Sequence, residues 1–190
     1  MCQKELALPR VKLTIEYDGT DLAGWQRQDG VPTVQQYLEK AVSAYFNTDE
    51  RLLVQCSGRT DAGVHAFGQV AHVDFPEERD SHSVVQGINY HLKTSQVVVL
   101  EAEPVDDEFN ARFDAKQRHY EYRIINRRTP LAIARNRAWQ IPEPLDVDAM
   151  HKAAQLLVGT HDFNSFRDTQ CQSESSVKTI DTITVSQDKN

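Results

Sequence analysis

The residues with the clearest capacity for chemistry lie in one short segment, Cys56-Ser57-Gly58-Arg59-Thr60-Asp61-Ala62-Gly63-Val64-His65-Ala66. Asp61 lies between two glycines, and Arg59 precedes it by two positions. Glycine permits backbone angles and close approach that a Cβ would block. An ionised carboxylate on such a loop can attack a substrate or stabilise positive charge, and a nearby guanidinium favours its ionised form. The alternative is an Asx turn, in which Asp61 hydrogen-bonds only to its own loop.

Two predicted strands, at about 52–57 and 69–75, flank this segment and must position Asp61 on the loop 56–66 that joins them. Alternating apolar residues predict an earlier strand at 11–17. Thr33 and Gln36 form a capping-box pattern that opens a helix with apolar residues at helical spacing. A second helix at 80–92 and a strand at 97–102 follow. The resulting order, β-α-β-β-α-β, predicts a ferredoxin-like unit over residues 9–105, an antiparallel sheet covered by helices.

Residues 106–190 predict a second unit with an α+β composition. Its expected elements are a long strand at 118–126, a short strand at 138–141, a helix capped by Asp146 that stops at Gly159, and a strand at 179–185. No further helix or strand follows in the sequence, so we expect this unit to be incomplete. The predicted fold class of the whole chain is therefore α+β.

The composition is that of an ordinary water-soluble protein of 190 residues. No apolar run approaches the roughly 20 residues that a membrane helix needs, and the first ten residues lack a secretory pattern. We therefore expect a cytoplasmic protein without a membrane partner. Cys2, Cys56 and Cys171 are distant from one another, which predicts reduced thiols. His65 and His72 with Cys56 match no common zinc spacing, so no metal site is predicted.

The net charge of −7 opposes binding to nucleic acid, because an acidic surface repels phosphate. The distribution of charge is more informative than the total. Between residues 112 and 137 the positive charges greatly outnumber the negative ones, Asp114 and Glu121. These positive residues are Arg112, Lys116, Arg118, Arg123, Arg127, Arg128, Arg135 and Arg137. Such a cluster is typical of a phosphate track, although each arginine taken singly also fits a solvated surface.

Several ordered motifs carry a family resemblance. The run Gly58-Arg59-Thr60-Asp61-Ala62-Gly63-Val64-His65 resembles the catalytic motif of the tRNA pseudouridine synthase A family. Other blocks of that family are similar to segments of this chain that follow in the same order. They are Ile15 to Thr20, Gly24 to Gln28, Thr33 to Gln36, Phe109 to Phe113, Arg118 to Tyr122, Gly159 to Phe166, and Gln170-Cys171-Gln172.

The resemblance implies an enzyme with the pseudouridine synthase fold that isomerises uridines 38–40 in the tRNA anticodon stem-loop, without cofactor or metal. It implies that Asp61 is the catalytic nucleophile and that Arg59 occupies the place of the everted base. It also implies that Tyr120 stacks on the target base. Full-length members are homodimers. The family continues past the position of Asn190 with a segment that supplies an arginine to the catalytic aspartate, so a C-terminally truncated synthase is expected.

Other interpretations remain open from the residues. An RNA-binding module shares the β-α-β-β-α-β order and would bind without chemistry, although its aromatic strand motif is missing from the sequence. An inactive fragment of the synthase is a further alternative. Tyr122 fits either a base contact or an ordinary core position. His161 and Asp162 fit a catalytic pair less well than a structural or RNA-positioning loop.

Overall fold

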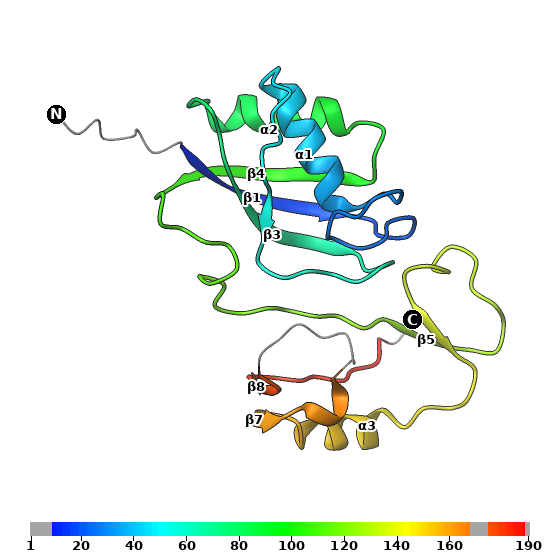
Figure 1. The fold of residues 1–190 in the computed structure, drawn as a ribbon. Helices are drawn as coiled ribbons and strands as arrows, with labels where there is room; N and C mark the ends of the chain where they lie inside the picture. Colours follow the sequence, from blue (N-terminus) through cyan, green and yellow to red (C-terminus); the bar gives the residue numbers. More distant parts are fainter. Residues whose placement is uncertain (1–8, 168–174, 189–190) are drawn as a thin grey trace. The chain divides into compact units, whose positions relative to one another are not determined.

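The structure is a computed structural model that describes residues 9–167 and 175–188. The chain divides into two compact units, Met1–Glu121 and Tyr122–Asn190. The described residues form three α-helices and several antiparallel strand pairs, so the protein is mixed α/β. Figure 1 shows the arrangement of these elements. The motif Gln170-Cys171-Gln172 and the thiol of Cys2 lie outside the described residues.

The first unit contains one sheet and two helices. Its elements are β1 (Arg10–Tyr17), α1 (Val34–Tyr45), β2 (Gln55–Cys56), β3 (Ala66–Asp74), α2 (Ser81–Leu92) and β4 (Val97–Val105). The strands lie in the order β2-β3-β1-β4, and every neighbouring pair is antiparallel. Both helices cover the same face of the sheet (Figure 1). The hydrophobic core between the sheet and the two helices contains fully buried side chains such as Leu13, Ile15, Leu38 and Ile88.

Local signals explain where the helices begin. The Thr33 hydroxyl accepts a hydrogen bond from Gln36 N at 3.3 Å, which confirms the predicted N-cap of α1. The Asp80 carboxylate accepts from Ser83 N at 3.0 Å and caps α2 in the same way. Such caps satisfy backbone donors that have no partner inside the helix. Both helices therefore start where their sequences predict.

One strand of the first unit is shorter than predicted, and this unit includes residues beyond 105. The strand expected at 52–57 is reduced to Gln55–Cys56, because only these residues pair with β3 at the edge of the sheet. The segment 106–121, which the sequence assigned to the second unit, packs on the first. There the Arg10 guanidinium donates to Phe109 O at 2.9 Å, and Ala111 N donates to His72 Nδ1 at 3.1 Å. The first compact unit accordingly extends to Glu121, whereas the sequence placed the boundary of the ferredoxin-like unit at residue 105.

The second unit contains shorter elements. They are β5 (Ile124–Asn126), β6 (Trp139–Ile141), α3 (Val147–Gln155), β7 (Gly159–Asp162), a 3₁₀ turn (Asn164–Phe166) and β8 (Val177–Ile180). Strands β5 and β6 are parallel, and β7 and β8 are antiparallel. Asp146 caps α3 as predicted, through a hydrogen bond from Ala149 N at 2.9 Å. None of the α3 residues is buried.

Three predictions for this unit are wrong in their extent. The strand expected at 118–126 covers only Ile124–Asn126, because ladder pairing with β6 begins there. The strand expected at 179–185 is Val177–Ile180. Gly159 does not end the helix, which stops at Gln155; instead it opens β7 with a φ of 109°. A positive φ at that position favours glycine over any residue with a Cβ.

Candidate active site

The loop between β2 and β3 is fixed at its base by hydrogen bonds to β3. Ser57 N donates to Val70 O at 2.8 Å, and the Ser57 hydroxyl lies 2.8 Å from Gln69 Oε1. The Gln69 amide then donates to Gly58 O at 2.6 Å. The Gln69 side chain is thus hydrogen-bonded to both Ser57 and Gly58, the residues at the start of the loop. These contacts hold the chain at the point where it leaves the sheet towards Asp61.

A second set of hydrogen bonds joins the middle and end of this loop to the segment that follows β1. Trp25 N donates to Thr60 O at 2.9 Å, and Gly63 N donates to Leu22 O at 3.2 Å. Gly19 N donates to His65 Nδ1 at 3.1 Å. Trp25 itself is 1% exposed, so its backbone amide belongs to the core. The residues on both sides of Asp61 are therefore held by buried or half-buried structure.

Two glycines allow this segment to approach the loop closely. A Cβ on Gly24 would lie 2.5 Å from Thr60 O and 3.0 Å from Asp61 C. A Cβ on Gly19 would lie 2.1 Å from Val64 O. Gly24 also has a φ of 87°, which disfavours other residues. Any side chain at either position would have to displace the backbone beside Asp61.

Two ionisable groups near the loop stay protonated at neutral pH. Burial raises the pKa of the Cys56 thiol to about 11, so Cys56 is a poor nucleophile. Burial also raises the pKa of Tyr17, whose hydroxyl lies 2.8 Å from Thr60 Oγ1. The Tyr17 phenol therefore acts as a neutral hydrogen-bonding partner that fixes the residue before Asp61.

Asp61 itself is exposed at the turn of the loop. Its main-chain carbonyl accepts a hydrogen bond from Val64 N at 3.3 Å, and Gly63 supplies the positive φ of 79° that the turn requires. Among residues 9–167 and 175–188, no donor bonds to the Asp61 carboxylate, in contrast to the helix caps Asp80 and Asp146. The backbone of Asp61 is thus held while its carboxylate faces solvent, which does not favour the Asx-turn alternative.

The other predicted site residues lie in the same unit. Arg59 is exposed on the loop, and Tyr120 is 76% exposed near the end of the unit. The Arg118 guanidinium, two residues before Tyr120, donates to Ser57 O at 2.6 Å. The structure therefore ties the segment that carries Tyr120 to the loop that carries Asp61. Tyr122, which is 88% exposed, belongs to the second unit and is not a core residue among those described.

The pair His161 and Asp162 has a structural environment in the second unit. His161 Nε2 lies 3.0 Å from Val158 O. The Asp162 carboxylate accepts from Asn164 N at 3.0 Å, and a hydrogen bond with Ser176 is the main cause that lowers the pKa of Asp162. These contacts hold the chain where β7 leads into the 3₁₀ turn. They agree with a structural role for His161 and Asp162.

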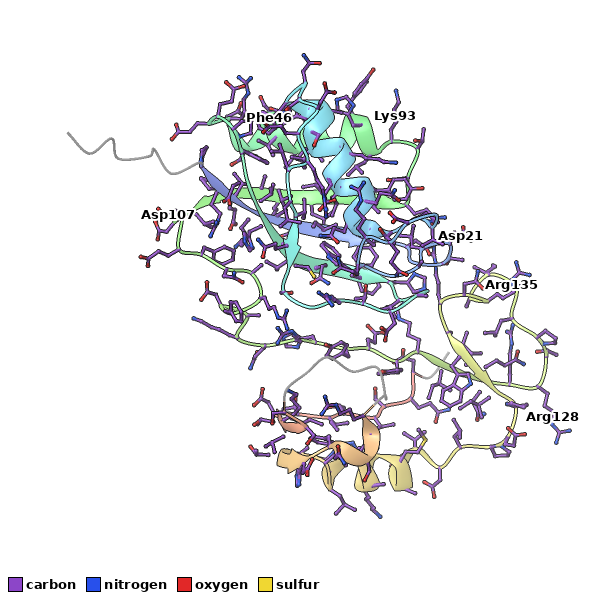
Figure 2. The ribbon with its side chains drawn as sticks, in the orientation of Figure 1. Asp21, Phe46, Lys93, Asp107, Arg128 and Arg135 are labelled. Atoms are coloured by element: carbon purple, nitrogen blue, oxygen red, sulfur yellow. The ribbon has the colours of Figure 1, made fainter. Side chains whose placement is uncertain are left out.

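The predicted basic cluster is divided between the two units. Arg112, Lys116 and Arg118 belong to the first unit and are exposed. In the second unit, the side chains of Arg128 and Arg135 project from the loop between β5 and β6 (Figure 2). The cluster therefore supplies exposed positive charge to each unit.

A buried polar network on α1 was not predicted from the sequence. Gln35 is 4% exposed and Glu39 is 1% exposed, although both lie on the apolar face of α1. Gln35 Oε1 accepts from Arg27 N at 2.9 Å, and its amide donates to Val54 O at 3.0 Å. The Glu39 carboxylate accepts from Arg27 and from Arg51, at distances of 2.8–3.0 Å. The available signal was that Gln35 and Glu39 are four residues apart and directly follow the apolar residues Val34 and Leu38.

No helix in the described part of the chain is long and apolar enough to cross a membrane. In the same residues, no group of three or more histidine, cysteine or acidic side chains could hold a metal ion. The site therefore consists of a carboxylate, exposed arginines and an exposed tyrosine. Such a set can hold a polyanion and stabilise positive charge at a reacting carbon.

The chain is similar in sequence to known proteins. A family model described as tRNA pseudouridine synthase matches residues 13–114 and 153–190. The chain is 51% identical over 179 residues to the tRNA pseudouridine synthase A of Maricaulis maris, and this match covers 94% of the chain and 71% of the relative. It is 54% identical over 181 residues to the enzyme of the same name from a Bradyrhizobium species, covering 95% and 73% respectively.

A third relative, from Rhodopseudomonas palustris, has the same name and is 52% identical over 178 residues, which cover 94% of the chain and 72% of the relative. The chain belongs to the tRNA pseudouridine synthase family. It spans slightly less than three quarters of the length of these relatives.

Proposed function

We propose that this protein is a tRNA pseudouridine synthase that isomerises uridines 38–40 of the anticodon stem-loop, with Asp61 as its catalytic carboxylate. The observation that carries the proposal is the Asp61 loop. Hydrogen bonds hold its backbone on both sides of Asp61, because Trp25 N donates to Thr60 O and Gly63 N donates to Leu22 O. The Asp61 side chain is exposed. Family membership supports tRNA as the substrate.

The reaction exchanges one bond for another without any net change in composition. The bond from uracil N1 to the ribose C1′ breaks, the base turns, and a bond from C5 to C1′ forms. The C5 proton is released, and N1 takes up a proton. Positive charge develops at C1′ as in glycoside cleavage, and an ionised carboxylate can stabilise or trap it. Asp61 supplies that carboxylate, and no oxidant or reductant is required.

A uridine in a folded RNA must leave its stack before this chemistry can occur, at a cost of a few kcal/mol. We assign Arg59 to the vacated position, where a planar guanidinium can stack and hydrogen-bond. We assign Tyr120 to the everted uracil, because this residue is 76% exposed and its segment is hydrogen-bonded to the loop through Arg118. Stacking on an aromatic side chain is worth about 1–3 kcal/mol per base.

We also propose that the first unit is ferredoxin-like, which is supported by its β-α-β-β-α-β order and its antiparallel strand order β2-β3-β1-β4. We further propose that the protein acts in the cytoplasm as a homodimer that binds tRNA across both subunits. The proposals of a cytoplasmic location and of a homodimer rest on the resemblance of the sequence motifs to those of the family. Gel filtration with light scattering tests the dimer, because a monomer at assay concentration would contradict it.

Mapping of pseudouridine in treated tRNA tests the proposed function. Unmodified tRNA is incubated with the protein, and pseudouridines are located by carbodiimide modification and primer extension. We expect new stops at positions 38–40 and none elsewhere. Stops in another arm would refute the choice of site. Binding of tRNA without any new stop would instead indicate an RNA-binding module.

A further inference from the structure

Arg118 joins two segments that are far apart in the sequence. Its guanidinium donates to Ser57 O at 2.6 Å, and it also lies 3.4 Å from Arg112 O. Ser57 opens the loop that carries Asp61, whereas Arg112 belongs to the segment that packs on β3 after β4. A hydrogen bond from a charged donor is stronger than a neutral one. The short bond from the Arg118 guanidinium to Ser57 O is therefore a strong connection between these segments.

Gly58 shows how closely Arg118 approaches the loop. A Cβ at Gly58 would lie 3.2 Å from Arg118 Nε and 3.6 Å from its Cδ. The stem of Arg118 therefore covers the Cα of Gly58 while the end of the side chain bonds to the preceding carbonyl. On its other face, the Gly58 carbonyl accepts from the Gln69 amide at 2.6 Å. The base of the loop is thus held between a strand residue and Arg118.

We propose that Arg118 is a positioning residue for the reaction. It sets the base of the Asp61 loop relative to the segment that carries Tyr120, so that the carboxylate and the stacked base are presented in a fixed relation. This inference rests on the proposed function, because it assigns Asp61 and Tyr120 to the same substrate. It gives Arg118 a different role from the phosphate contact that its charge alone would suggest.

The two roles differ in measurable ways. A phosphate contact contributes to binding of the RNA, so its loss raises KM and reduces the dependence of binding on salt by about 0.7–0.9 in logarithmic slope. A positioning contact acts on the bound complex, so its loss lowers kcat. A misplacement of about 1 Å can reduce the rate by as much as about 100-fold.

The experiment compares Arg118→Ala and Arg118→Lys with the unaltered protein in single-turnover and steady-state release of tritium from tRNA labelled at uracil C5. Arg79→Ala is the matched control, because it removes an exposed arginine that pairs with Glu77, on the loop before α2. Thermal melting confirms that each variant is folded. Salt titration of tRNA binding gives the number of phosphate contacts.

For Arg118→Ala we expect kcat to fall between about 10- and 100-fold, KM to stay within about twofold, and the salt slope to remain unchanged. Lysine has a single charged centre that can reach one carbonyl, so Arg118→Lys should recover part of kcat. Arg79→Ala should match the unaltered protein. An unchanged kcat with a raised KM and a smaller salt slope would overturn the proposal. Equal losses of kcat in Arg118→Ala and Arg79→Ala would also overturn it.

A different result would refute the proposed function. If Asp61→Asn retains full turnover, the assignment of the catalytic carboxylate is wrong whatever Arg118 does. If Asp61→Asn is inactive and Arg118→Ala keeps its kcat, only the positioning role is refuted.

Discussion

The close approach of Gly24 to the Asp61 loop gives a prediction whose size follows from the geometry. A Cβ on Gly24 would lie 2.5 Å from Thr60 O, which is about 0.9 Å closer than an ordinary contact of about 3.4 Å. Gly24 is also tied to the loop and to α1 by its neighbours, because Trp25 N donates to Thr60 O and Val34 N donates to Gly24 O. A side chain at position 24 must therefore displace the peptide group between Thr60 and Asp61.

Gly24→Ala should consequently move the Asp61 backbone by close to 1 Å and lower kcat by about 10- to 100-fold. Its positive φ adds a cost in stability of about 1–2 kcal/mol, which is unrelated to the loop. Gly30→Ala separates the two effects. Gly30 has a φ of 79°, and a Cβ there would meet nothing within 4 Å. This control should lose a similar stability from backbone strain but keep its kcat.

The assay is tritium release under saturating tRNA, combined with urea unfolding of both variants at the same temperature. The expected result is a loss of kcat in Gly24→Ala with a KM close to that of the unaltered protein. If Gly24→Ala and Gly30→Ala show the same kcat, the segment after β1 does not position Asp61, and this reasoning is refuted.

Three further outcomes are expected. Tyr120→Phe should keep kcat/KM within about twofold, whereas Tyr120→Ala should lose about 1–3 kcal/mol of transition-state stabilisation; equal losses would argue against stacking. Thr33→Ala should lower the free energy of unfolding by about 1 kcal/mol, and Thr33→Ser should restore most of it, as urea unfolding can show. Burial lowers the pKa of His72, so its contribution to stability is complete above the usual pKa of about 6.5 and decreases as the pH falls below it. The urea midpoint should therefore be lower at pH 5.5 than at pH 7.5. An equal decrease in the His72→Gln variant would show that protonation of His72 is not the cause.

The sequence predicted those features that depend on local interactions. Thr33 and Asp80 begin their helices as expected, because a cap requires only a side chain and an amide three residues later. The loop that carries Asp61 was likewise predicted between two strands. Local patterns therefore sufficed to place the candidate catalytic residue.

Features that depend on distant partners were not predictable in this way. The strand expected at 118–126 shortened to Ile124–Asn126, because strand length is set by pairing with β6 and not by the alternation of side chains. The contacts of Gly24 with Thr60 and of Arg118 with Ser57 join segments that no local pattern relates. Gln35 and Glu39 were missed because a helical pattern treats polar residues as solvent-facing.

The most direct test of the central claim is the activity of Asp61→Asn, which replaces a carboxylate oxygen by an amide nitrogen of similar size. Asp29→Asn, at another exposed loop carboxylate, is the control. We expect Asp61→Asn to bind tRNA with an affinity close to that of the unaltered protein and to release no tritium above background, while Asp29→Asn keeps full turnover. Sustained formation of pseudouridine by Asp61→Asn would contradict the role assigned to this carboxylate.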